Sequence, residues 1–282
     1  MSPSPRRRRS ALFLPASNPR AIAKARALPC DVVILDLEDA VAPDRKDEAR
    51  AAAIAAVAEG GFDGREVVIR ANAIDTDTGR ADLAALANVA VDAVLLPKVA
   101  GPATVEAARA ALGDGGLPLW AMIESAGGLL ALPAIARAAP SLRLVALVAG
   151  TNDLALDLRC RPEADRAPLL PALAQVIAAA RAGGMAALDG VLNVIDDPGR
   201  LAAECAQGRR WGFDGKTLIH PTQIDAANAA YGASAEELAW ARAVRAAFAD
   251  PLAADRGAIR LNGAMVERLH LAEAERLLAL AD

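Results

Sequence analysis

The sequence predicts an α/β protein, a closed (β/α)₈ TIM barrel followed by a C-terminal helical and hairpin arm. Short β-branched apolar runs alternate with Ala- and Leu-rich segments of helical period, a pattern typical of βα units around a parallel sheet. The chain has 282 residues, which fits eight such units because a barrel of this kind takes roughly 250 residues. The apolar residues are mainly Ala, Leu and Val, which suits helices packed closely on a sheet.

Eight apolar runs predict the strands of the barrel. In chain order they cover residues 10–16, 31–38, 66–72, 93–98, 118–124, 142–150, 186–192 and 216–220. Segments of helical period lie between them and predict helices at residues 18–28, 45–58, 81–88, 102–112, 129–139, 169–182 and 198–210. Several of these segments begin with Asp, Asn, Gly or Pro, residue types that start helices well.

The last part of the chain exceeds what a barrel needs. After residues 221–231, Ser234 and Glu237 have the spacing of a capping box and predict a helix over residues 234–249. Residues 257–266 resemble a short hairpin, and residues 269–280 a final amphipathic helix. We therefore expect residues 1–232 to form the catalytic barrel and residues 233–282 to form an arm or lid that could reach a neighbouring subunit.

Composition and charge argue against several classes of partner. Lys and Arg number 31 against 35 Asp and Glu, and aromatic residues make up 3%, so neither a polyanion-binding surface nor a stacking platform for nucleic acid is indicated. The sequence shows no uncharged apolar stretch near 20 residues and no signal-peptide pattern. We expect a soluble, cytoplasmic protein with no nucleic-acid and no membrane partner.

Two smaller features concern cysteine and the N-terminus. Cys30, Cys160 and Cys205 are far apart and lack metal-ligand spacing, so we expect reduced packing residues. The basic run at residues 6–9 is flanked by Pro and Ser. We expect a solvated leader with at most Arg9 engaged, and a contact with a coenzyme phosphate is the alternative.

Polar residues follow the predicted strands at their carboxyl ends. In a barrel of this type these ends form the active-site mouth, whereas the opposite ends mainly stabilise the fold. Each residue follows an apolar run, so its charge needs a partner, a metal ion or water. The residues are Asp36, Glu38, Asp39, Arg70, Asn72, Lys98, Glu124, Asp153, Asp189 and His220.

Two of these carboxylates predict a metal site. Glu124 and Asp153 are one βα unit apart, which would bring them from adjacent strand ends to one point. Two converging carboxylates without Cys or His favour a hard divalent ion, and Mg²⁺ is the natural choice because an incomplete shell leaves room for water and substrate oxygens. The competing interpretation is two independent carboxylates that cap helices or pair with arginines. His220 and His270 are the only histidines, which excludes a multi-histidine zinc site.

The remaining residues at the mouth each have two interpretations. Lys98 pairs with Glu38 or Asp36, or it reaches the substrate. The amides of Gly127 and Gly128 offer a cradle for an oxygen-rich ligand. We expect Asp189 to support a neighbouring strand end. His220 is a proton shuttle or a hydrogen-bonded residue of the mouth.

Taken together, the motifs of this chain resemble the CitE-like proteins of the HpcH/HpaI aldolase and citrate lyase family, whose nearest members are citrate lyase beta subunits and malyl-CoA or citramalyl-CoA lyases. The resemblance extends over residues 9–265. It rests on the order and strand-end positions of Arg9-Ser10-Ala11-Leu12, Asp36-Leu37-Glu38-Asp39, Arg70-Ala71-Asn72, Leu96-Pro97-Lys98, Ile123-Glu124-Ser125, Gly150-Thr151-Asn152-Asp153 and Phe213-Asp214-Gly215-Lys216.

This resemblance implies a Mg²⁺-dependent carbon–carbon lyase. Such an enzyme cleaves a 3-hydroxyacyl thioester, carried by CoA or an acyl-carrier protein, to a 2-oxo acid and an acyl thioester, or runs the reverse condensation. The family's two metal ligands match Glu124 and Asp153, and its substrate-binding arginine matches Arg70. The fixed planar cation of Arg70 suits the developing enolate or keto oxygen. A homotrimer is the oligomer that the resemblance implies.

The general base has three candidates. Some relatives carry a C-terminal Asp that acts on the substrate, sometimes in the neighbouring subunit's site. The matching position here is Glu267, which keeps the carboxylate but adds a methylene, and Leu269 stands where Pro is common. Glu38 and Asp39 are the other candidates, either as base or as residues that hold metal-bound water.

Two other functions compete with the lyase. One is a class II pyruvate aldolase acting on hydroxy-oxo acids without a thioester. The other is a non-catalytic CitE-like partner subunit, against which the presence of Arg70, Glu124 and Asp153 together argues. Citryl, malyl and citramalyl thioesters all remain candidate substrates, because the choice depends on the shape of the pocket and on Glu267.

Overall fold

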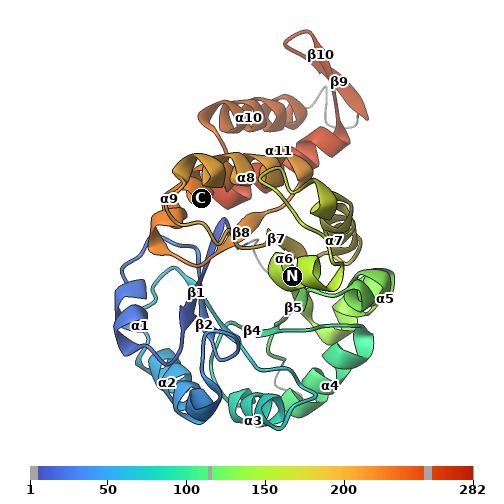
Figure 1. Ribbon diagram of the computed structural model, residues 1–282. Coiled ribbons are helices and arrows are strands. Elements are labelled where there is room, and N and C mark those ends of the chain that lie inside the picture. Colours follow the sequence, from blue (N-terminus) through green and yellow to red (C-terminus); the bar gives the residue numbers. More distant parts are fainter. Residues whose placement is uncertain (1–5, 114–115, 251–255, 282) are drawn as a thin grey trace. The chain divides into compact units, whose positions relative to one another are not determined.

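A computed structural model of the protein describes residues 6–113, 116–250 and 256–281. Eight parallel strands follow one another around a closed barrel, and β1 also pairs with β8 (Figure 1). This confirms the predicted (β/α)₈ TIM barrel. The strands are β1 (Ser10–Pro15), β2 (Val32–Asp36), β3 (Glu66–Arg70), β4 (Ala93–Leu96), β5 (Leu119–Ile123), β6 (Leu144–Ala149), β7 (Ala186–Asp189) and β8 (Gly215–Leu218).

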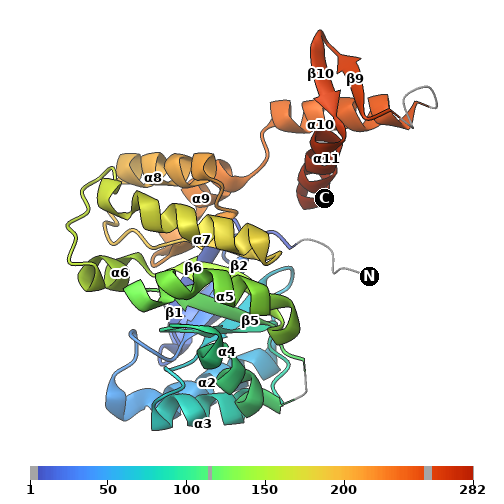
Figure 2. The same cartoon turned by 90° about the vertical axis from the view of Figure 1, so that its right-hand side faces the viewer.

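Helices surround the strands, and α5 and α7 pack side by side on the outside of the barrel (Figure 2). The helices are α1 (Pro19–Ala25), α2 (Lys46–Glu59), α3 (Asp77–Leu86), α4 (Pro102–Leu112), α5 (Ala126–Leu142), α6 (Thr151–Asp157), α7 (Leu170–Ala182), α8 (Pro198–Trp211) and α9 (Ile224–Tyr231). Short 3₁₀ turns, η1 (Pro43–Arg45), η3 (Ala167–Leu169) and η4 (Pro221–Gln223), precede α2, α7 and α9.

The strands bury both of their faces, as a parallel barrel requires. Along β2, Val32 and Ile34 belong to the apolar cluster inside the barrel, whereas Val33 and Leu35 belong to the larger layer beneath the helices. The same alternation along the other strands explains why their sequences are almost continuously apolar. It also decides which polar residues at the strand ends point into the mouth.

The N-terminal end of the barrel is closed by two arginines. Arg8 pairs with Glu66 at 2.7 Å, and its guanidinium carbon lies 4.9 Å from the centroid of the buried Trp120 ring. Arg9 pairs with Asp31, also at 2.7 Å. The prediction that at most Arg9 is engaged is therefore wrong, because the buried carboxylate of Glu66 needs a cation and Arg8 supplies it.

The observed starts of α3 and α5 differ from the predicted starts because a capping residue precedes the apolar pattern of each helix. Thr76 caps α3 by accepting a hydrogen bond from the Gly79 amide, and Ser125 caps α5 in the same way at Gly128. Both helices therefore begin earlier than predicted. The predicted strands run too far at their carboxyl ends, and α6 is not predicted at all because it has only seven residues.

A buried charge network joins the last two strands to the helices outside them. Asp189 at the end of β7 accepts hydrogen bonds from Arg166 at 2.8 and 2.9 Å. Lys216 on β8, which is fully buried, pairs with Glu204 on α8 at 2.6 Å and donates to the Gly190 carbonyl. Asp189 thus supports its neighbouring strand, as the sequence predicts.

Residues 232–250 and 256–281 belong to a second compact unit. It contains α10 (Ala235–Ala249), the antiparallel pair β9 (Ala258–Leu261) and β10 (Ala264–Glu267), and α11 (Arg268–Ala281). The predicted capping box at Ser234 and Glu237 is present. In the described parts of the chain, no helix is long and apolar enough to cross a membrane.

Candidate active site

Arg70, the last residue of β3, is the centre of the polar cluster at the carboxyl ends of the strands. Its Nε and Nη2 atoms donate to the two carboxylate oxygens of Asp36, each at 2.6 Å. One face of the guanidinium lies over the ring of Phe13, 4.8 Å from the centroid. The two oxygens and the ring fix the plane of the guanidinium, which leaves Nη1 as the edge for other partners.

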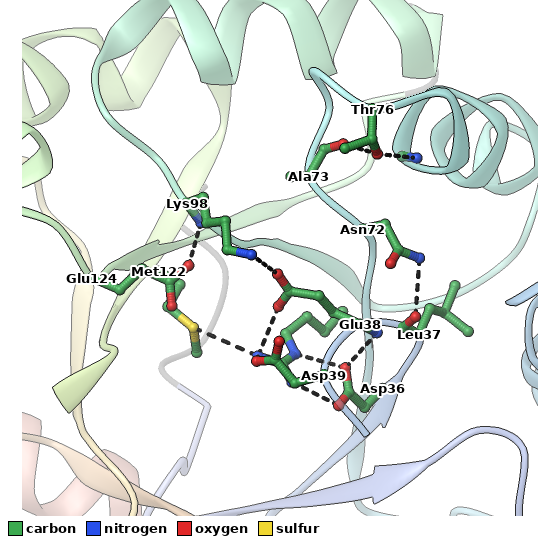
Figure 3. Close-up of polar contacts among 12 residues, drawn as sticks. Asp36, Leu37, Glu38, Asp39, Asn72, Ala73, Thr76, Lys98, Met122 and Glu124 are labelled. Atoms are coloured by element: carbon green, nitrogen blue, oxygen red, sulfur yellow. Dashed lines mark hydrogen bonds and ion pairs between the residues drawn. The ribbon is translucent and has the colours of Figure 1, made fainter. Parts of the chain in front are cut away.

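Nη1 of Arg70 lies between two further carboxylates. It is 2.9 Å from Glu38 and 3.1 Å from Asp39, and both of these carboxylates are labelled in Figure 3. Glu38 is buried, and this burial raises its pKa while the charge of Arg70 opposes the rise. Asp39 is largely exposed. Burial lowers the pKa of Arg70, but hydrogen bonding to Asp36 and the three carboxylate charges more than offset it, so Arg70 stays cationic.

Hydrogen bonds to its backbone carbonyl oxygens support the loop that carries Glu38. Lys46 donates to the carbonyl oxygens of Leu37 and Glu38 at 2.8 and 2.7 Å. Asn72 donates to the Leu37 carbonyl at 3.0 Å, and its side chain is held by the fully buried Asp82 at 2.7 Å. The side-chain positions of Glu38 and Asp39 are therefore supported by bonds to the backbone.

Lys98 connects this cluster to the next strand end. Its Nζ lies 3.1 Å from Glu38, which confirms the predicted pairing, and this partner raises the pKa of Lys98 (Figure 3). The backbone of Lys98 has a left-handed φ of 53°, which turns its amide toward Glu124, and that amide donates to Glu124 Oε1 at 2.5 Å. The side chain of Lys98 is about half exposed, so it can also meet a substrate.

Glu124 is a buried carboxylate without a cation at its side. It forms no ion pair with any Lys or Arg that the structure describes, and burial together with the charges of Glu38 and Asp153 raises its pKa to about 8. Its side chain packs against Gly150, where an added Cβ would lie 2.5 Å from Glu124 Cβ and 2.8 Å from Oε2. A glycine is therefore required at position 150 for Glu124 to occupy this place.

Asp153 lies in the first turn of α6, directly after β6, and is half-buried. In residues 6–113, 116–250 and 256–281 its carboxylate has no hydrogen-bond donor and no ion-pair partner. The charge of Asp153 is one of the smaller causes of the raised pKa of Glu124. Among the described residues neither carboxylate pairs with an arginine, and Glu124 accepts the Lys98 amide. Joint binding of a metal ion by Glu124 and Asp153 stays a prediction.

The charge balance of the mouth suits a divalent cation. The carboxylates of Asp36, Glu38, Asp39, Glu124 and Asp153 outnumber the cations of Lys46, Arg70 and Lys98. No group of three His, Cys, Asp or Glu residues able to hold a metal occurs in the described parts of the chain. The predicted site with only two protein ligands, Glu124 and Asp153, leaves the other positions to water or substrate oxygens, and it stays a prediction.

The predicted amide cradle is largely occupied. The Gly128 amide is taken by the Ser125 cap, and an added Cβ at Gly128 would lie 2.6 Å from the Val99 carbonyl oxygen. Close packing therefore explains this glycine, and the prediction of a free amide at Gly128 is wrong. Gly127, which is exposed, stays a prediction as a ligand contact.

Two further residues that the sequence singles out are His220 and Glu267. The His220 ring is hydrogen-bonded to Thr222 at 2.8 Å, which agrees with the interpretation as a bonded residue at the end of β8. Glu267 ends β10 in the C-terminal unit, where its amide donates to His270 Nδ1 at 2.9 Å. Its catalytic role stays a prediction.

Some residues of the site escaped the sequence analysis. Phe13 and Met122 face Arg70 from inside the barrel, with Met122 Sδ 3.9 Å from Nη1. The period-two alternation of their strands would have pointed both side chains inward. Asp82 gave no such signal, because it lies within the polar pattern of α3 although it is fully buried.

Comparisons with known proteins agree with this geometry. The family described as HpcH/HpaI aldolase/citrate lyase matches residues 9–221. A (3S)-malyl-CoA thioesterase of Cereibacter sphaeroides is 44% identical over 97% of this chain and 94% of its own length. Citrate lyase subunit beta of Escherichia coli is 33% identical over 98% of this chain and 94% of its own length.

Among solved structures, CitE of Mycobacterium tuberculosis in complex with magnesium, acetoacetate and coenzyme A superimposes with a TM-score of 0.76. It is 37% identical to this chain and covers 96% of it, and the match includes 97% of CitE. RipC of Yersinia pestis gives a TM-score of 0.70 at 30% identity, over 81% of this chain and 97% of RipC.

Proposed function

This chain belongs to the HpcH/HpaI aldolase/citrate lyase family, and we propose that it is a Mg²⁺-dependent enzyme that cleaves the carbon–carbon bond of a 3-hydroxyacyl-CoA of the malyl-CoA class. The products are a 2-oxo acid and an acyl-CoA, and the reverse condensation uses the same site. One observation carries the proposal: Glu124 follows β5 and Asp153 lies at the start of α6 after β6, neither has a cationic partner in the described chain, and the fixed cation of Arg70 ends β3.

Glu124 and Asp153 are the residues that would hold Mg²⁺. Their oxygen donors, the excess of carboxylates around them and the CitE structures solved with magnesium support this assignment. When bound, Mg²⁺ supplies a Lewis acid and a template for the oxygens of the oxo-acid half of the substrate. Burial is the main cause of the raised pKa of Glu124, and a cation beside it would favour the ionised carboxylate.

Arg70 stabilises the oxygen on which negative charge develops. Asp36 and Phe13 hold its guanidinium in one plane before substrate arrives, so little reorganisation is needed when charge appears near Nη1. Glu38 lies between Arg70 and Lys98 and orients both cations. Asp39 is exposed beside Nη1, which makes it the barrel carboxylate best placed to take the hydroxyl proton. Glu267 of the C-terminal unit is the competing base.

A polar cavity supports a long phosphate-bearing carrier. It occupies about 560 Å³ at the loops that follow β1 and β2, and Asn18, Arg20, Ala40 and Arg45 are among its lining residues. Ala40 directly follows Asp39, so this cavity adjoins the Arg70 cluster. Arg20 forms no ion pair with the described residues, so its charge is available to a phosphate group of CoA.

Thioester hydrolysis is the second candidate reaction. It is favoured by the 44% identity to the (3S)-malyl-CoA thioesterase, which exceeds the 33% identity to the citrate lyase subunit. Hydrolysis needs the same substrate-binding residues, with water attacking the thioester carbonyl in place of cleavage of the carbon–carbon bond.

One product analysis tests both reactions. The chain is incubated with (3S)-malyl-CoA in Mg²⁺ or in EDTA, and the products are separated by chromatography. The proposal expects glyoxylate and acetyl-CoA with Mg²⁺ only. Malate and free CoA would establish hydrolysis instead. Cleavage of a hydroxy-oxo acid lacking CoA would support the pyruvate aldolase alternative, and failure with a full thioester panel would leave the non-catalytic subunit. Light scattering checks the expected homotrimer.

A further inference from the structure

The helix that carries Asp153 is too short to be stable by itself. α6 spans seven residues, and its N-cap residue Gly150 provides no side-chain cap. Isolated helices of this length do not persist in water, so contacts with other elements must hold α6 in place. Asp153 also has no hydrogen bond in the described chain that would orient it. The position of its carboxylate therefore depends on what holds α6.

A contact at the end of α6 reaches the start of α5, the helix that directly follows the other proposed metal ligand. Asp157, one helical turn after Asp153, accepts a hydrogen bond from the Ala126 amide at 2.6 Å. Ala126 is the first residue of α5 and follows Glu124 by two positions. The bond is charge-assisted and lies at the positive end of the α5 dipole, which strengthens it.

A second contact holds the start of α6 from the opposite side. Asn152 and Asn193 exchange side-chain amide hydrogen bonds of 2.9 and 3.3 Å. Asn193 lies in the β7–α8 loop, which is itself fixed because Gln223 donates to the Leu192 carbonyl at 2.9 Å. The first turn of α6, which contains Asp153, is thus held between this loop and the start of α5.

From this geometry we infer that Asp157 is a positioning residue for the metal site: its bond to the Ala126 amide sets the separation of Glu124 and Asp153, and the Asn152–Asn193 pair supports it from the other side. The inference rests on the proposed function, because it assumes that Glu124 and Asp153 bind Mg²⁺. Asp157 does not itself touch the ion or the substrate. Its effect therefore appears in metal affinity, which is measured without substrate.

The test compares variants that remove one bond each. Free Mn²⁺ is measured by electron paramagnetic resonance as the chain is titrated, with Mg²⁺ as competitor. Asp157→Ala should weaken binding roughly tenfold or more, the usual effect of losing a residue that orients a metal ligand. Asp157→Asn keeps an acceptor oxygen and should bind closer to the wild type than to Asp157→Ala. Asn193→Ala should also weaken binding, and it replaces Asp157→Ala as the test variant if Asp157→Ala does not fold.

Asp197→Ala is the matched control. Asp197 accepts the Arg200 amide at 2.8 Å at the start of α8, a helix that carries no proposed ligand. This variant should lose thermal stability and keep its Mn²⁺ affinity. Wild-type affinity in a folded Asp157→Ala overturns the inference, as does an equal loss in Asp197→Ala. If Asp157→Ala does not fold, wild-type affinity in Asn193→Ala overturns it. If the wild type binds no Mn²⁺, the proposed function fails and the inference fails with it.

Discussion

Arg70 and Asp36 form a two-point ion pair between adjacent strand ends, with two N–O distances of 2.6 Å. The pair fixes a planar cation before any substrate is present and leaves Nη1 directed at Glu38 and Asp39. The three donors of a lysine ammonium group lie on one nitrogen, so lysine cannot reproduce this planar two-point arrangement.

Replacing Arg70 by lysine should therefore damage catalysis more than folding. The lost stabilisation of a developing negative charge is about 3 to 4 kcal/mol, on the order of a hundredfold in kcat or more. The positive charge that Asp36 and Glu38 need is kept, so the protein should still fold. Steady-state kinetics measure the loss, and circular dichroism monitors the fold. A kcat within a few fold of the wild type would remove Arg70 from the reaction.

Metal binding should release a proton near neutral pH. The pKa of Glu124 is raised to about 8, so below that pH the metal-free protein carries a proton that Mg²⁺ must displace. The apparent affinity should rise by about tenfold per pH unit up to roughly pH 8 and level off above it. Calorimetric titration in buffers of different ionisation enthalpy counts the protons released. Glu124→Gln, which has no proton to release, is the control and should bind Mg²⁺ poorly.

Gly150→Ala should displace the side chain of Glu124 without removing its carboxylate. The added methyl group would lie 2.5 Å from Glu124 Cβ, a contact that forces one of the two to move. The backbone φ of −83° at Gly150 is acceptable for alanine, so strain in the backbone does not explain a loss. We expect Mg²⁺ binding to weaken although both carboxylates remain. The matched control is Gly127→Ala, because a Cβ added at Gly127 would make no close contact.

The sequence predicted the barrel, and it indicated most residues of the candidate site, because both depend on local patterns. The apolar runs mark strands that are buried on both faces, and charges such as Glu124 and Arg70 directly follow them. The missed features depend on contacts between distant segments. Arg8 lies in the N-terminal basic run but pairs with Glu66, which is distant in the sequence. The buried Asp82 has the same sequence pattern as an exposed polar residue of a helix. α6 has too few residues for a periodic pattern.

The buried network at β7 and β8 should contribute to stability and not to the reaction. Lys216→Met leaves Glu204 buried without its 2.6 Å partner, and breaking such a pair costs about 3 to 5 kcal/mol. The double variant Lys216→Met with Glu204→Gln removes both charges and should recover part of this loss.

Urea denaturation followed by circular dichroism measures these changes in the free energy of unfolding. Mn²⁺ affinity of the folded variants serves as the control and should stay near the wild-type value, because the side chain of Lys216 on β8 pairs with Glu204 on α8 and not with a proposed metal ligand. Equal stability of Lys216→Met and the wild type would mean that Arg166, 3.4 Å from Glu204, neutralises this carboxylate without help.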